Sequence, residues 1–121
     1  MSAALNQEIQ EAINNLGKLL RENPLVGEYL DAAQRVRQDG QLVEMEARLY
    51  SLYEQLIARQ QSGEQLSQEE VESFNLLRQQ VFNHPLIVER EARLKPVKAF
   101  FAEVATEISA PLGVDYTILA Q

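Results

Sequence analysis

The chain has 121 residues, a length that suits a single domain, and it contains no cysteine. The missing cysteines exclude disulfides, thiol nucleophiles and zinc–thiolate sites. Eleven Lys and Arg residues against eighteen Asp and Glu residues give a net charge of −7. Nucleic acid is therefore a poor direct partner, because its affinity rests mainly on cations that meet phosphates.

The sequence also shows no signal for membrane insertion or export. The negative balance argues against docking on anionic lipid, and no apolar run approaches the roughly 20 residues that cross a bilayer. The N-terminus lacks the positive charge and apolar stretch of a signal peptide. We therefore expect a cytoplasmic protein.

Apolar residues recur at helical spacing along the chain, and no segment alternates like a strand. The first segment, residues 5–21, gathers its apolar side chains within an arc of about 120° on a helical wheel. Asn23 is the expected cap of a second helix that begins at Pro24 and ends near Asp39, because proline fits the first position of a helix. A kinked continuation of the first helix is the alternative.

The third segment, residues 41–61, has the strongest pattern, with Asp39 as its expected cap. Its apolar arc spans roughly 180°, more than one packing contact needs. The helix should therefore touch two neighbours at once, or one neighbour and a second subunit. Behind a short turn, Ser67 and Glu70 have the spacing of a capping box that starts a fourth helix, which forms an antiparallel hairpin with the third.

His84, before Pro85, is the expected cap of the last helix, whose apolar stripe keeps its phase across Pro96. These features predict an all-α fold: an antiparallel bundle of about five helices, with a helical hairpin at its centre and a kinked last helix. We expect one domain over residues 1–121, with an additional N-terminal helix in residues 1–22 and a short tail in residues 113–121.

No catalytic or cofactor-binding constellation is recognisable. His84 is the only histidine, which excludes zinc motifs that need two histidines, and no phosphate-binding glycine loop is present. The acids Glu64, Glu69, Glu70 and Glu72 are best explained as a solvated helix start that complements the helix dipole. The alternative is a weak divalent-cation or small-molecule site. We expect no enzymatic activity, no metal and no cofactor.

Most aromatic side chains fall on or beside the apolar stripes, where core packing explains them. Tyr50 and Phe100 lie at stripe edges, and aromatic anchors ringed by polar residues are typical of binding surfaces. Together with Tyr53 and Ile57, which widen the arc of the third helix, they form the candidate interaction surface. The surplus apolar face also predicts a homo-oligomer.

The order of these signals is similar to that of a known family. Tyr29-Leu30-Asp31-Ala32-Ala33 leads to a break at Asp39-Gly40, and a long helix then reaches Arg59 and the turn and capping box that follow. His84-Pro85-Leu86-Ile87 opens the last helix, and Ile108-Ser109-Ala110-Pro111-Leu112-Gly113-Val114-Asp115-Tyr116 closes the pattern. In this order the chain resembles the YlbF/YmcA family of small bacterial helical proteins, from about Leu16 to Tyr116.

The resemblance implies a cytoplasmic regulatory protein without enzymatic activity. Members of that family act in multiprotein complexes in competence, sporulation and biofilm development, and they modulate the ribonuclease RNase Y. Other proteins, including a ribonuclease-associated complex, are therefore the expected partners. Some family members bind iron–sulfur clusters through cysteines, a role that cannot extend to this chain. The sequence departs from the family at Gly40, where relatives usually have proline, at Pro96, and in the helix before Leu16.

Overall fold

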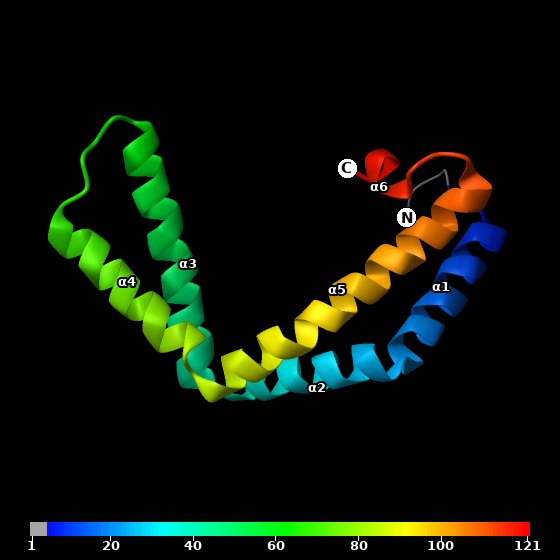
Figure 1. Cartoon of the computed structure of the whole chain (residues 1–121), viewed down its shortest axis with the longest axis horizontal. Helices are drawn as coiled ribbons and strands as arrows, with labels where there is room; N and C mark the ends of the chain where they lie inside the picture. Colours follow the sequence, from blue (N-terminus) through cyan, green and yellow to red (C-terminus); the bar gives the residue numbers. More distant parts are fainter. Residues whose placement is uncertain (1–4) are drawn as a thin grey trace. The chain divides into compact units, whose positions relative to one another are not determined.

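A computed structural model describes residues 5–121, which form an all-α fold with no strand in that range. The elements are α1 (Gln7–Glu22), α2 (Pro24–Gln38), α3 (Gly40–Gln61), α4 (Gln68–Phe82), α5 (Pro85–Leu112) and the short α6 (Tyr116–Leu119) (Figure 1). None of the helices described combines the length and apolarity that crossing a membrane requires.

The chain divides into two compact units. Unit 1 comprises Met1–Asp31 and Arg93–Gln121, and unit 2 comprises Ala32–Ala92. Unit 1 therefore holds α1, the start of α2, most of α5 and α6, whereas unit 2 holds the end of α2, the α3–α4 pair and the start of α5. The single domain expected from the sequence stays a prediction.

The break between α1 and α2 occurs at Asn23, in front of a proline. Asn23 has an extended backbone with ψ 130°, as the steric demand of Pro24 requires. Its side-chain Oδ1 accepts a hydrogen bond at 2.9 Å from the backbone N–H of Leu25. Two separate helices therefore meet here, and the kinked single helix is wrong.

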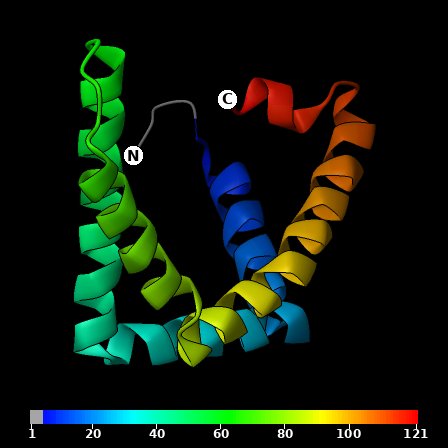
Figure 2. The same cartoon turned by 60° about the vertical axis from the view of Figure 1, so that its left-hand side comes forward.

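Unit 2 is built on the α3–α4 hairpin, whose two helices are in contact and diverge toward the loop that joins them (Figure 1). Figure 2 shows the same pair from another side. Its core is a cluster of aliphatic side chains from α2, α3, α4 and the start of α5: Val36, Leu42, Leu49, Leu77, Val81 and Ile87. Met45, Leu52, Phe74 and Leu86 pack around this cluster. The start of α5 is further tied to α3 by a bidentate ion pair between Arg90 and Glu46, with N–O distances of 2.5 and 3.1 Å.

The last long helix runs without interruption through Pro96 to Leu112. Proline removes one helical hydrogen bond, but the kink expected at Pro96 stays a prediction. The helix ends at Gly113, whose φ of +82° lies in the left-handed region that glycine adopts readily. The tail is not wholly irregular, because Asp115 caps the single turn of α6 by accepting from the N–H of Thr117.

Burial is distributed unequally between the units. Unit 2 contains nearly all of the buried apolar side chains, whereas unit 1 buries Val26 and Val97, and α1 buries none. The apolar stripe of α1 is real but uncovered, since Ile13 is 48% exposed and Leu19 is 66% exposed. The fold therefore concentrates its stabilising burial in unit 2.

We expect Leu42→Ala to lower the free energy of unfolding by about 2–5 kcal/mol, because it removes a side chain that is almost fully buried in the unit 2 core. The matched control is Leu76→Ala on the exposed side of α4, for which we expect a change within about 0.5 kcal/mol. Urea denaturation followed by circular dichroism measures both. Equal losses would contradict this description of the core.

Candidate interaction surface

An apolar hollow opens on the surface of the α3–α4 hairpin. Its volume is about 350 Å³, and its walls are formed by Leu49, Tyr50, Tyr53, Phe74, Arg78 and Phe82. Tyr50 and Tyr53 are about half exposed, and Phe82 is also exposed. We call this set of six residues the hairpin surface.

The hairpin surface combines rigid aromatic rings with one cation. The rings of Tyr53 and Phe74 lie 6.0 Å apart at a tilt of 31°, within the range of favourable aromatic pairs. Arg78 makes no ion pair or side-chain hydrogen bond within residues 5–121. Its guanidinium is therefore available to a carboxylate that arrives together with apolar side chains.

The structure separates the four residues that the sequence grouped together. Tyr50 and Tyr53 share the hairpin surface, whereas Ile57 is half-buried further along α3 and does not line the hollow. Phe100 belongs to unit 1, where it packs edge-to-face on Phe101 with ring centroids 5.7 Å apart.

Sequence reasoning missed four members of the hairpin surface: Leu49, Phe74, Arg78 and Phe82. The two phenylalanines looked like core residues because they fall on or beside an apolar stripe. Arg78 could have indicated this surface. A cation within the apolar stripe of α4 indicates that this part of the stripe is exposed to solvent and not buried in the core.

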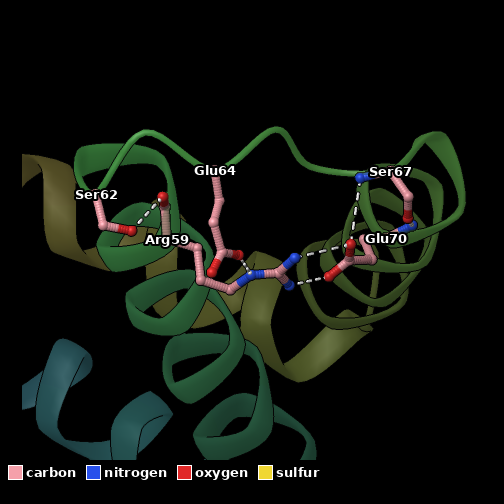
Figure 3. A network of polar contacts seen from close by, with 5 residues as sticks. All are labelled: Arg59, Ser62, Glu64, Ser67 and Glu70. Carbon is pink, nitrogen blue, oxygen red and sulfur yellow. Dashed lines mark hydrogen bonds and ion pairs between the residues drawn. The ribbon is translucent and has the colours of Figure 1, made fainter.

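The tip of the hairpin is held by a polar network around Arg59 (Figure 3). The Arg59 guanidinium donates to Glu64 Oε2 at 2.6 Å and to both carboxylate oxygens of Glu70. Ser67 caps α4, and Glu70 Oε1 accepts a hydrogen bond from the Ser67 N–H at 3.2 Å, which completes the capping box. The network joins the end of α3 to the beginning of α4 across the loop.

This network shifts the pKa values of Glu70 and Arg59. The hydrogen bond from Arg59, followed by those from Ser67, lowers the pKa of Glu70 from its ordinary 4.5 to about 2. The same contact with Glu70, and then that with Glu64, raises the pKa of Arg59. Both groups are thus charged at neutral pH, and Glu70 is occupied as a structural group.

Asp39 and His84 lie together at the other end of the hairpin. Asp39 caps α3 by accepting from the N–H of Leu42 at 3.0 Å. His84 Nδ1 accepts from the N–H of Leu86 at 3.1 Å, and Nε2 lies 4.0 Å from Asp39 Oδ2. Both side chains thus make contacts at the starts of helices, Asp39 at α3 and His84 at α5.

Three of the four acids that offered a cation site, Glu64, Glu70 and Glu72, are engaged in local contacts. Glu64 and Glu70 bind Arg59, and Glu72 accepts from Gln68 at 3.1 Å. Among residues 5–121, no group of three acids, histidines or cysteines is arranged to hold a metal ion. No observation therefore favours the metal-binding alternative.

The fold and the hairpin surface together define a small all-helical protein with an exposed aromatic contact surface. A family model described as "Control of competence regulator ComK, YlbF/YmcA" matches residues 9–113, and the chain belongs to this family. The match begins inside α1, so most of that helix falls within the family pattern. No curated protein and no solved structure matches the chain.

We expect Arg59→Gln to raise the pKa of Glu70 from about 2 toward 4.5, because it removes the main contact that stabilises the carboxylate. A carbon-detected NMR titration of the glutamate side chains measures this shift, with Arg78→Gln as the control that leaves Glu70 unchanged. Since the folded pKa is the lower one, the contribution of Glu70 to stability is present above pH 4.5 and is lost as the pH falls toward 2. A Glu70 titration that is the same in both variants would contradict the network.

Proposed function

We propose that this protein is a non-enzymatic regulatory adaptor that acts in the cytoplasm through contacts with other proteins. The observation that carries the proposal is the hairpin surface, where exposed aromatic rings surround an apolar hollow beside an unpaired arginine. Aromatic and arginine side chains of this kind dominate the energy of protein–protein interfaces. Membership of a family named for the control of a competence regulator supports a regulatory role.

The hairpin surface also defines the chemistry of its partner. An apolar anchor should fill the hollow, and a carboxylate next to that anchor should pair with Arg78. A partner complex that contains a ribonuclease fits the resemblance to the YlbF/YmcA family. The net charge of −7 supports an action on the nuclease complex and not on the RNA backbone.

Self-association forms the second part of the proposal. Many large apolar side chains remain exposed on a single copy, including Leu19, Leu76 and Ile118. Apolar surface of this extent marks sites of association in soluble proteins. We therefore propose a homo-oligomer that presents the hairpin surface to its partners.

We expect the double substitution Tyr50→Ala and Tyr53→Ala to reduce the amount of captured partner about tenfold or more, because it removes two aromatic anchors. The test is affinity capture from the native organism, read by quantitative mass spectrometry. The matched control replaces two side chains of similar exposure elsewhere in unit 2, Leu76→Ala with Val88→Ala. Retention of the same proteins at the same level by both double variants would contradict the proposal, provided that both fold as judged by circular dichroism.

A further inference from the structure

Unit 1 contains an apolar face that its own helices leave open. Along α1, the side chains of Ile9, Ile13, Leu16 and Leu19 are all exposed, and so is Leu5 just before the helix. A hollow of about 490 Å³ lies between α1 and α5, lined by Leu16 and by Phe100, Glu103, Val104, Glu107, Ile108 and Pro111. A helix of 16 residues with no buried side chain has little stability of its own in water. Another surface must therefore cover this face.

The charges of unit 1 are separated along its length. The N-terminal end of α1 and the C-terminal end of α5 lie at the same end of the unit (Figures 1 and 2). That end carries the acidic zone: Glu8, Glu11, Glu103 and Glu107. The opposite end carries the basic zone, in which five cations outnumber three acids: Lys18, Arg21, Arg93, Lys95 and Lys98 against Glu22, Glu28 and Asp31. Arg93 pairs with Glu28 at 3.2 Å. Within residues 5–121, no ion pair involves the acidic zone or the four lysines and arginines Lys18, Arg21, Lys95 and Lys98.

This pattern is unfavourable within one copy and favourable between two. Inside the unit, acids of α1 lie near acids of α5, and cations lie near cations. A second copy related by a two-fold axis would place its basic zone against the acidic zone of the first copy. At the other end of the interface, its acidic zone would lie against the basic zone of the first copy. Because a two-fold interface uses the same patch on both copies, one such pairing satisfies both ends at once.

We propose that the open face of α1 and α5 is a homodimer interface, in which the unit 1 helices of two copies associate in antiparallel orientation. The occupant of the hollow is a second copy of this chain, whose apolar stripe on α1 covers Leu16 and its neighbours. The inference deepens the self-association proposed above by naming its surface, and it leaves the hairpin surface free for a different partner.

The chain as a whole exposes more area than two separate folded units of its mass would. The chain exposes 9305 Å², whereas two separate folded proteins of half its mass would together expose about 8000 Å². The chain therefore exposes on the order of 1000 Å² more than two fully separated units would. Separation of the two units does not account for this excess. A stable dimer needs about 800 Å² from each partner.

The test uses two charge-reversal variants of the full chain, measured by analytical ultracentrifugation. The first replaces acids (Glu11→Lys with Glu107→Lys), and the second replaces cations (Arg21→Glu with Lys98→Glu). Each variant alone should dimerise about 10- to 100-fold more weakly than the parent chain, because reversal turns attraction into repulsion at both ends of the interface. An equimolar mixture should recover dimers, because each reversed zone of one variant then meets a zone of opposite sign on the other variant.

Two further measurements separate the possible failures. Ile13→Gln should weaken the dimer, because Ile13 is 48% exposed in one copy and its apolar side chain is available to a second, whereas Leu76→Gln should leave the dimer unchanged. A parent chain that stays monomeric at 100-fold above the working concentration would overturn the inference and the proposed self-association. A dimer that is unaffected by either charge variant, or a mixture that stays monomeric, would overturn the antiparallel interface alone. Partner capture by the hairpin surface is measured independently of all these outcomes.

Discussion

Burial of one small aliphatic cluster between α3, α4 and the adjoining ends of α2 and α5 is the interaction on which unit 2 depends. Val81 and Ile87 are completely removed from solvent, and Leu42 nearly so. The cluster lies entirely within unit 2. Since burial of apolar area is the main favourable contribution to folding, unit 2 can hold its helices by its own contacts, whereas unit 1 has few buried side chains to hold α1.

The two apolar surfaces that remain differ in chemistry, and this difference explains why we assign them different partners. The hairpin surface has aromatic walls and a cation, Arg78, that makes no ion pair within residues 5–121, so we assign to it an acidic, apolar segment of another protein. The face of unit 1 is mainly aliphatic and has acids at one end and mostly cations at the other, so we assign to it a second copy of the chain. In the proposed account, one surface serves assembly and the other serves recognition.

The local features of the fold could be predicted from the sequence because they depend on residues close together in the chain. Proline after Asn23 dictates a break, and the spacing of Ser67 and Glu70 dictates a capping box, wherever the helices pack. The contents of a shared surface depend instead on which helices meet. Helical periodicity placed Tyr50 and Phe100 at the edges of two apolar stripes, but it does not show that the two residues belong to different units. Periodicity likewise shows that α1 is amphipathic, but it does not show which surface covers the apolar face of α1.

The most direct measurement of the central claim is hydrogen–deuterium exchange of the full chain at concentrations well below and well above dimer formation. A single copy gives α1 no buried side chain, so its amides should exchange rapidly when dilute. We expect peptides from α1 to become strongly protected at high concentration, while peptides from α3 and α4 exchange at the same rate throughout. Exchange in α1 that does not change with concentration would show that no second copy covers this helix.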